Sequence, residues 1–455
     1  MSELKVSKYQ AYPEYKDSGV EWLDEIPKHW VLSRVKYIAP FQVGWTPPTK
    51  NDENFVGENL WVNISDLKGK VITVTSKRIS DKAAKEASMS ITPKGSLMYS
   101  FKLSVGAVSF AGEDMYTNEA IASFLDSARL PLSYLYYALP KFVIENASTN
   151  IYGARILNQE LINNAQLLEP TPEEADNIAN FLDHETAKID TLIDKQQQLI
   201  KLLKEKRQAV ISHAVTKGIS NKEHPQAPMK DSGVEWLGEV PAHWVVSKIK
   251  NYAKVESGHT PSKSKEEYWV DCTIPWVSLN DSRQLKTVDY IDNTAYQISE
   301  LGMANSSAHL LPARAVVFTR DASIGLSAIT TKPMAVSQHL IAWLCNEKYL
   351  IPEYLLLIFY AMESEFNRYT FGATLKTIGM DNVRSLTAAF PLVEEQGQIV
   401  KWVFGSVDKI KSSTEKAENV ITLLKERRTA LISAAVTGKI DVRNWVKPIE
   451  THEGK

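Results

Sequence analysis

One long segment in the middle of the chain occurs again at its end. Residues 181–219 and 402–440 share LLKE, a basic pair, an A-V/L-I-S-x-A-V-T pattern and a closing pair of lysine and glycine. Apolar residues recur in both copies at the heptad spacing that is typical of coiled coils. The expected seam is Leu182, Ile189, Ile193, Ile200, Leu203, Val210 and Ala214 in the first copy, and Val403, Ile410, Thr414, Ile421, Leu424, Leu431 and Ala435 in the second.

A second repeat lies upstream of each of these segments. Residues 16–36 read KDSGVEWLDEIPKHWVLSRVK, and residues 230–250 read KDSGVEWLGEVPAHWVVSKIK. Since leader and helical segment occur in the same order twice, nearly the whole chain is an internal duplication.

The regions between the repeats differ in sequence but keep common landmarks. A Gly-x-Thr-Pro motif begins at Gly44 and at Gly258, and single glycines, Gly106 and Gly325, follow matched β-rich runs. Short apolar runs at 97–101, 120–125, 315–319 and 340–344 predict strands, and 132–145 and 352–369 predict helices. Each variable region is therefore expected to be a mixed α/β globule.

Each repeated helix is expected to start at a proline-containing segment, E-P-T-P-E-E or F-P-L-V-E-E, with acidic residues in its first turn. Gly218 and Gly438 are expected to end the helices. An apolar stripe on a long helix needs a partner, and the other copy can supply it. We expect antiparallel packing, which makes the contact self-complementary. The polar seam residues either set the register or contact a partner subunit: Thr186, Gln196, Arg207, Thr414 and Arg428.

The composition indicates the compartment in which the protein works and limits how it can bind nucleic acid. Cys272 and Cys345 are too few for a disulfide framework, and their apolar neighbours predict buried thiols in a reducing compartment. We find neither a signal peptide nor a run of 18 apolar residues, so a cytoplasmic protein is expected. The formal net charge of −2 argues against a protein that coats nucleic acid through bulk positive charge.

Catalytic motifs are missing from the sequence. There is no phosphate-binding G-x-x-x-x-G-K-S/T loop, no G-x-G-x-x-G turn, no H-E-x-x-H and no G-x-S-x-G elbow. His29 and His243 lie in matched segments without a second ligand nearby, so packing or turn-capping roles are favoured over metal binding. The matched tryptophans, Trp22 with Trp236 and Trp30 with Trp244, anchor the leaders in a core or form a patch that faces a partner. The sequence indicates recognition without catalysis.

The chain resembles the DNA specificity subunits of type I restriction–modification systems. The resemblance rests on the duplicated S-G-V-E-W-L-x-E-I/V-P-x-H-W leader, the P-T/L-x-E-E helix start and the L-L-K-E-K/R-R helix end. It implies an α+β protein in which two mixed α/β target recognition domains are separated by two long helices, an antiparallel intramolecular coiled coil with pseudo-two-fold symmetry. The expected divisions are 1–168 for the first leader and recognition domain, 169–219 for the first spacer helix, 220–388 for the second leader and domain, 389–441 for the second helix, and 442–455 for a tail.

The resemblance also implies the partners. Each recognition domain would read one half of a bipartite site in double-stranded DNA, and the helices would set the gap. Two modification subunits would bind S-adenosylmethionine and methylate adenine, and restriction or motor subunits would use ATP with Mg²⁺. No cofactor and no catalysis are expected in this chain. Two other readings stay open: a scaffold that holds two protein-binding modules, and an enzyme that restricts and modifies by itself.

DNA contacts are expected from polar and basic residues on the matched loops. Any one of these side chains can equally be an ordinary solvated turn residue. In the first domain they are Thr46, Thr49, Lys50, Lys102, Ser104, Tyr152, Arg155 and Asn158. In the second they are Thr260, Ser262, Lys263, Lys265, Arg320, Ser323, Lys376 and Thr377. Lys102 and Arg320 occupy different columns when Gly106 and Gly325 are aligned, so the two domains need not use these charges alike.

Overall fold

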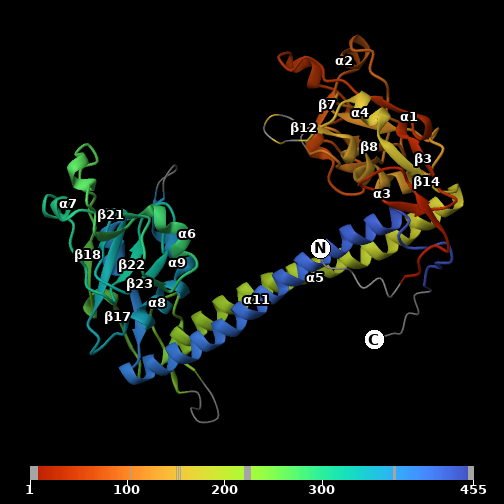
Figure 1. Cartoon of the computed structure of the whole chain (residues 1–455). Coiled ribbons are helices and arrows are strands. Elements are labelled where there is room, and N and C mark those ends of the chain that lie inside the picture. Colours follow the sequence, from red (N-terminus) through yellow and green to blue (C-terminus); the bar gives the residue numbers. More distant parts are fainter. Residues whose placement is uncertain are drawn as a thin grey trace. The chain divides into compact units, whose positions relative to one another are not determined.

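The computed structural model describes residues 9–102, 104–149, 151, 153, 155–219, 227–371 and 376–448 (Figure 1). The chain divides into two compact units. Unit 1 comprises residues 1–195 and 420–455, and unit 2 comprises residues 196–419. Two long helices, α5 (Pro172–Lys217) and α11 (Val393–Val436), each contribute one part to unit 1 and the other part to unit 2.

Unit 1 is built on a five-stranded mixed sheet and a three-stranded sheet. The larger sheet has the order β4 (Phe41–Val43), β11 (Ile121–Phe124), β8 (Leu97–Ser100), β9 (Val108–Ala111) and β6 (Val71–Ile72). The smaller one has the order β10 (Tyr116–Thr117), β5 (Asn59–Val62) and β7 (Lys77–Ile79). Two-stranded pairs complete the unit: β1 (Tyr15–Asp17) with β2 (Glu25–Pro27), β3 (Val31–Arg34) with β14 (Gln166–Glu169), and β12 (Ser148–Thr149) with β13 (Arg155–Ile156).

Unit 2 repeats this topology strand for strand. Its larger sheet has the order β18 (Ala253–Ser257), β25 (Leu340–Cys345), β22 (Val316–Thr319), β23 (Ser327–Thr330) and β20 (Tyr290–Ile291). Its smaller sheet has the order β21 (Tyr296–Ile298), β19 (Ile274–Val277) and β24 (Ala335–Val336). The pairs are β15 (Met229–Asp231) with β16 (Glu239–Pro241), β17 (Val245–Lys248) with β28 (Thr387–Phe390), and β26 (Thr370–Phe371) with β27 (Thr377–Ile378). The predicted duplication is confirmed at the level of strand order.

Shorter helices cover the sheets. Those of unit 1 are α1 (Val35–Ile38), α2 (Asp81–Glu86), α3 (Leu132–Phe142) and α4 (Gln159–Asn164). Those of unit 2 are α6 (Ser282–Leu285), α7 (Glu300–Ala304), α8 (Pro352–Ala361), α9 (Glu363–Phe366) and α10 (Met380–Ser385). The helices predicted at 132–145 and 352–369 are present but shorter, because 3₁₀ turns replace their last residues and the second is interrupted at Met362.

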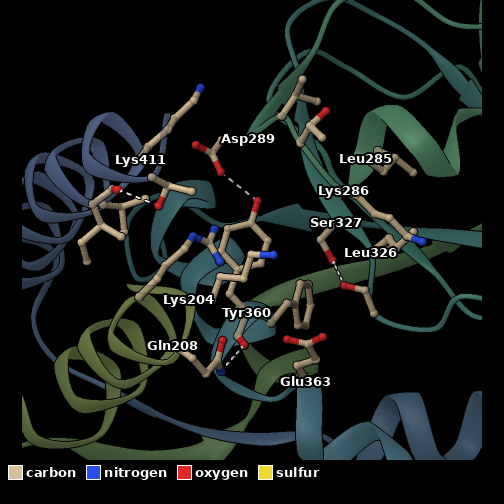
Figure 2. Close-up of a pocket in the computed structure, with 18 of the residues that line it drawn as sticks. Lys204, Gln208, Leu285, Lys286, Asp289, Leu326, Ser327, Tyr360, Glu363 and Lys411 are labelled. Carbon is tan, nitrogen blue, oxygen red and sulfur yellow. Dashed lines mark hydrogen bonds between the residues drawn. The ribbon is translucent and has the colours of Figure 1, made fainter. Parts of the chain in front are cut away.

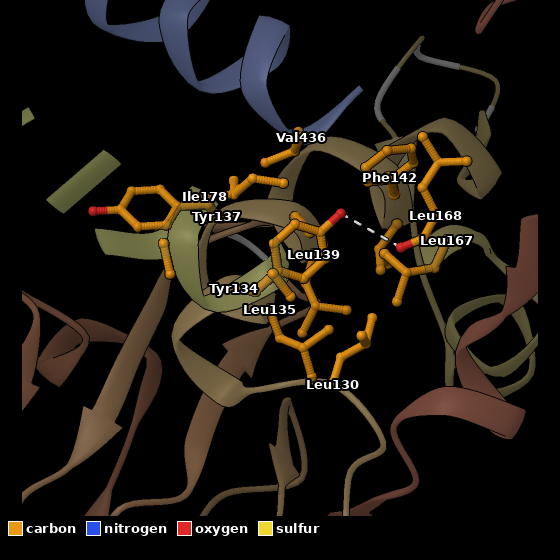
Figure 3. Packing of buried hydrophobic residues seen from close by; sticks show 14 of the residues in the cluster. Leu130, Tyr134, Leu135, Tyr137, Leu139, Phe142, Leu167, Leu168, Ile178 and Val436 are labelled. Carbon is orange, nitrogen blue, oxygen red and sulfur yellow. Dashed lines mark hydrogen bonds between the residues drawn. The ribbon is translucent and has the colours of Figure 1, made fainter. Parts of the chain in front are cut away.

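The core of unit 1 joins the globule to the long helices. Helix α3 packs against Ile178 of α5 and Val436 of α11, and the hydroxyl of Tyr134 donates to the carbonyl of Leu168 at 3.4 Å (Figure 3). In unit 2 the matching hydroxyl of Tyr354 donates to Ala389 at 3.1 Å. Both tyrosines are fully buried, so the hydrogen bond removes the penalty of burying a hydroxyl.

Several of the predicted seam residues are buried between the two long helices in each unit. In unit 1, Ile189 of α5 lies in one cluster with Leu431 of α11, and Asp190 pairs with Arg428 at 3.0 Å. In unit 2, Ala214 of α5 clusters with Val403 of α11. In each unit the earlier part of one helix meets the later part of the other, so the two helices run antiparallel.

The predicted helix ends are confirmed. Gly218 and Gly438 adopt φ values of +77° and +73°, which favour glycine because it has no Cβ. The acidic first turns are also present, with Glu173 and Glu174 in α5 and Glu394 and Glu395 in α11.

The two cysteines are less buried than the sequence predicts. Cys272 and Cys345 are only partly buried, because one lies in a loop and the other at the end of strand β25. Desolvation, with a smaller contribution from Glu347, still raises the pKa of Cys345 to about 12. None of the helices in the described ranges combines the length and apolar character of a membrane span.

Candidate nucleic-acid interface

Matched histidines attach each leader to the start of a long helix. His29 Nε2 lies 2.9 Å from Glu174 of α5, and His243 Nε2 lies 2.9 Å from Glu395 of α11. The same glutamates accept hydrogen bonds from Tyr12 at 2.6 Å and from the indole of Trp244 at 3.0 Å. The histidines therefore have packing roles, as the sequence favoured.

The leader tryptophans divide into two kinds. Trp30 and Trp244 are fully buried, which confirms that they anchor the leaders in the two cores. Trp22 and Trp236 are only partly buried and pack against the edges of the same cores.

Each Gly-x-Thr-Pro loop lies so close to a neighbouring strand end that no side chain fits at its first position. A Cβ on Gly44 would lie 1.8 Å from the carbonyl oxygen of Thr117, and one on Gly258 would lie 2.1 Å from that of Ser337. The loops are also held by indole N–H groups, since Trp61 donates to Trp45 at 3.0 Å and Trp276 donates to His259 at 3.2 Å. The two loops are therefore rigid and equivalent.

The threonine of this motif makes the same contact in both units. Thr46 donates to Glu119, and Thr260 donates to Gln338. Glu119 and Gln338 occupy equivalent positions, two residues after strands β10 and β24. Both threonine hydroxyls therefore connect the motif with the segment that leads into β11 in unit 1 and into β25 in unit 2.

Unit 2 extends this contact into a continuous chain of hydrogen bonds. Gln338 Nε2 lies 3.2 Å from His339 Nε2, and His339 Nδ1 lies 2.7 Å from Asp321 Oδ2. The other oxygen of Asp321 accepts from the hydroxyl of Thr377. All donors and acceptors match if the imidazole is neutral with its proton on Nδ1. The chain joins three of the predicted loops, through Thr260, the turn at 320–323 and the segment at 376–378.

Backbone hydrogen bonds hold the last two loops together. Ala322 N donates to Lys376 O and Ile378 N donates to Arg320 O, both at 2.9 Å. An isolated antiparallel bridge between Asp321 and Thr377 lies between these two hydrogen bonds. The pairing of β22 with β25 places His339 beside the same turn.

In unit 1 the equivalent strand positions carry different side chains. From the strand register, Phe101, Lys102 and Ala120 occupy the positions of Arg320, Asp321 and His339. Among the described residues of unit 1, the hydrogen-bond chain stops at Glu119, since alanine has no polar atom in its side chain. Lys102 and Arg320 do occupy different positions, as the alignment of the glycines predicts.

The other candidate residues of unit 1 lie on its surface. Thr49, Lys50, Lys102 and Ser104 are exposed. Arg155 donates to the carbonyl of Ile144 at 3.1 Å, and the side chain of Asn158 caps α4 by accepting from Leu161 N at 2.8 Å. Tyr152 lies outside the described residues.

Most candidate residues of unit 2 are also accessible. Ser262, Lys263, Lys265 and Lys376 are exposed, whereas Arg320, Ser323 and Thr377 are half-buried. Lys265 Nζ donates to the hydroxyl of Tyr268 at 3.1 Å, and this hydrogen bond raises the pKa of Lys265, so the ammonium stays charged. The guanidinium Nε of Arg320 lies 3.9 Å from Asp321, too far for a hydrogen bond.

Sequence reasoning missed three members of the hydrogen-bond chain: Asp321, Gln338 and His339. Asp321 directly follows a named candidate, and Gln338 and His339 immediately precede a predicted strand. The strand order is needed to see that these positions meet at the same end of two neighbouring strands.

A cavity of about 540 Å³ lies where the long helices of unit 2 meet its globule (Figure 2). Tyr360 connects its walls, because its hydroxyl donates to Asp289 at 2.8 Å and its carbonyl accepts from Gln208 of α5 at 2.8 Å. The guanidinium of Arg207 lies 5.2 Å from the centre of the Tyr360 ring. Arg207 therefore contacts the chain's own globule, whereas Arg428 of unit 1 contacts Asp190 on the other long helix.

No group of three or more His, Cys, Asp or Glu side chains is arranged to hold a metal ion in the part of the chain that the structure describes. The candidate interface consists of loops that carry amides, hydroxyls, carboxylates, lysines and the imidazoles of His259 and His339. These groups suit hydrogen bonding to base edges and phosphates.

Comparison with known proteins identifies the same repeated regions. The chain matches the family described as type I restriction modification DNA specificity domain over residues 27–202 and again over 241–423. The type I restriction enzyme MjaIX specificity subunit of Methanocaldococcus jannaschii is 24% identical over 96% of this chain and 99% of its own length. The EcoR124I/EcoR124II specificity subunit of Escherichia coli is 27% identical over 38% of this chain and 40% of its own length.

Solved structures share the fold. A chain from a study of complex assembly and conformational transition in the type I R-M system superposes with a TM-score of 0.66 at 15% identity, covering 91% of this chain and 99% of that one. The HsdS subunit of Thermoanaerobacter tengcongensis gives a TM-score of 0.54 at 15% identity, over 91% of this chain and 98% of its own. Because the family match extends over most of both repeats, the chain belongs to the type I restriction–modification DNA specificity family.

Proposed function

We propose that this chain is the specificity subunit of a type I restriction–modification complex and that its two units read the two different halves of a bipartite DNA sequence. One observation carries the proposal: equivalent positions of the repeated fold carry different side chains in the two units. Where unit 1 has Lys102 and Ala120, unit 2 has Asp321 and His339. A cation and an anion at one position need different partners on a base edge, so the half-sites differ.

The experiment tests whether one unit reads one half-site. Replacing His339 with alanine breaks the hydrogen-bond chain in unit 2, and replacing Glu119 with alanine removes the acceptor of Thr46 in unit 1. We expect His339→Ala to reduce base discrimination about tenfold or more in one half-site only, since a base contact supplies roughly 1–3 kcal/mol of discrimination. Glu119→Ala should affect only the other half.

The measurement is selection from a library of randomised DNA sites by the full complex with its modification subunits. If either variant changed both half-sites, or if the complex selected no sequence at all, the assignment of one half-site to each unit would be wrong. The second outcome is also what a protein-binding scaffold without a DNA role would give.

Catalysis is proposed to belong to the partner subunits. The sequence has no phosphate loop and no nucleophile elbow, which supports this division of roles. S-adenosylmethionine would then bind to the modification subunits, and ATP with Mg²⁺ to the restriction or motor subunits. The complex would act in the cytoplasm, where it meets the DNA of the cell.

Two copies of the modification subunit are proposed, because the spacer helices offer an equivalent apolar residue in each unit. Leu202 in unit 2 and Leu423 in unit 1 occupy matching positions of the repeat and are 61% and 63% exposed. Leu199 and Val420, three residues earlier in each copy, are exposed as well, so each unit presents an apolar patch of the kind that marks protein–protein contact.

We expect Leu202→Asp and Leu423→Asp each to remove one modification subunit and the double variant to remove both. Native mass spectrometry of the assembled complex measures this directly. Thr191→Asp, at an exposed polar position of α5, is the control and should leave the mass unchanged. Loss of both subunits from a single variant would contradict two independent docking positions.

A further inference from the structure

A second cavity opens beside the Gly-x-Thr-Pro loop of unit 2. Its volume is about 450 Å³, within the range of roughly 300–1,000 Å³ that is usual for small-molecule sites. Its lining includes Trp269, Trp276 and Tyr296, together with Lys263, Asn280 and Ser337. The hydrogen-bond chain described above passes along its edge, because Thr260, Gln338 and His339 also line it. The cavity therefore adjoins the residues expected to contact DNA.

The aromatic side chains of this cavity are held in place by contacts within unit 2. The rings of Trp269 and Trp276 meet edge to face with centroids 5.5 Å apart. Their indole N–H groups donate to the carbonyls of Ser262 and His259, both at 3.2 Å. Tyr296 is paired with Trp276 across the strands and is 52% exposed, so its ring is accessible to a ligand. These rings form a rigid surface on which a planar group can stack.

The polar side of the cavity has unused hydrogen-bonding capacity. Ser337 is 1% exposed, yet its hydroxyl oxygen has no hydrogen-bond partner within the described ranges. A buried polar atom without a partner is unfavourable, so a ligand that hydrogen-bonds there is favoured. Asn280 donates from its amide to Ser278 at 3.4 Å, which leaves its carbonyl oxygen to accept from a ligand. Lys263 is exposed at the same cavity and supplies a positive charge.

We propose that this cavity receives one unstacked nucleobase from the half-site that unit 2 reads. A base needs a flat aromatic surface for its face, donors and acceptors for its edge, and a cation for the adjoining phosphate, and the cavity offers all three. The proposal rests on the proposed function, since it assigns a base of the DNA site to a position within unit 2. Tyr296 is the stacking residue, and Ser337 and Asn280 read the edge.

Unit 1 differs at the decisive position. Lys77 pairs with Trp61 across the strands as Tyr296 pairs with Trp276, so lysine stands where unit 2 has tyrosine. The Nζ atom of Lys77 lies 5.1 Å from the centre of the Phe55 ring. The aromatic surface of unit 1 is thus covered by the unit's own cation, and the proposed base-binding cavity belongs to unit 2 alone.

The test uses the free-energy cost of unpairing one base from the duplex. Extruding a base breaks its pairing and stacking, and a mismatch removes part of that penalty. Each test duplex carries one mismatch, which is made by changing the base on the opposite strand and keeping the base that is read. Binding of these duplexes to the full complex with its modification subunits is then measured. We expect a mismatch at a single position of the unit 2 half-site to tighten binding about tenfold or more.

Pocket variants show whether unit 2 is responsible. In Tyr296→Ala the mismatch should no longer tighten binding at that position, and in Ser337→Ala the preference for one base there should fall. Lys77→Ala, the matched change in unit 1, should leave both effects intact. Circular dichroism of Tyr296→Ala checks that the exposed side chain can be removed without unfolding.

The outcomes separate this proposal from the proposed function. Sequence-selective binding in which no mismatch tightens the complex overturns base extrusion and leaves the function standing. Tightening that persists in Tyr296→Ala and in Ser337→Ala assigns the extruded base to another subunit and also overturns the proposal. A complex that selects no sequence overturns the proposed function itself.

Discussion

Replacing Ile189 with aspartate should destabilise unit 1 by about 4 kcal/mol or more, because the substitution buries an unpaired charge. Ile189 is 6% exposed and lies in the apolar cluster that joins α5, α11 and the first globule. A carboxylate there has no cationic partner in the cluster, so the helices must separate or the group must take up a proton. Hydrogen exchange measured by mass spectrometry follows the opening of each unit separately.

Two matched variants make the result specific. Ile410 holds the equivalent position of the repeat in unit 2 and is 8% exposed, so Ile410→Asp should destabilise unit 2 by a similar amount. Thr191→Asp introduces the same charge at an exposed position of α5 and should change the free energy of unfolding by no more than about 0.5 kcal/mol. Faster exchange throughout both units in Ile189→Asp would show that the two units do not open independently.

Lengthening α5 and α11 by one heptad each should change the gap in the recognised DNA sequence by about three base pairs, since seven residues add roughly 10 Å of helix and each base pair adds about 3.4 Å. Both half-sites should stay the same, because the loops that read them belong to the globules. Affinity for the original site should fall towards non-specific binding, which is the largest change we expect in DNA binding. Methylome sequencing of a host that carries the lengthened chain reports the gap and the half-sites together.

An insertion that breaks the heptad is the control. Three residues added to each helix rotate the apolar stripe out of register, so the seam around Leu203 and Leu424 should no longer pack. We expect that variant to lose modification instead of acquiring a new gap. If the heptad variant kept the original gap or changed a half-site, the helices would not determine the spacing.

Much of the fold was predictable from the sequence, because its signals are local. The heptad residues Leu182, Ile189 and Leu431 are buried where the apolar spacing predicts, and Gly218 and Gly438 take the left-handed conformation expected at helix ends. The strands predicted from apolar runs at 97–101 and 315–319 are the central strands of the two large sheets. Each of these features depends on the periodicity or the backbone freedom of a few neighbouring residues.

The site was predictable only in part. Thr260 and Thr377 were named from matched loops, but the residues that connect them were not. His339 and Asp321 lie 18 positions apart in the sequence and Thr377 lies 56 positions beyond Asp321, yet all three share one hydrogen-bond chain. Strand pairing brings them together, and no local pattern encodes which loops meet at a sheet edge.

The sequence by itself therefore determined that the chain is a duplicated α+β protein with two long, self-complementary helices, because repeats and heptads are local patterns along the chain. Only the tertiary structure decided what each unit presents for recognition. The register of β22 and β25 places His339 beside Asp321 in unit 2, and the matching strands place Ala120 beside Lys102 in unit 1. Since hydrogen bonds act over about 3 Å, recognition depends on which loops the fold brings into contact.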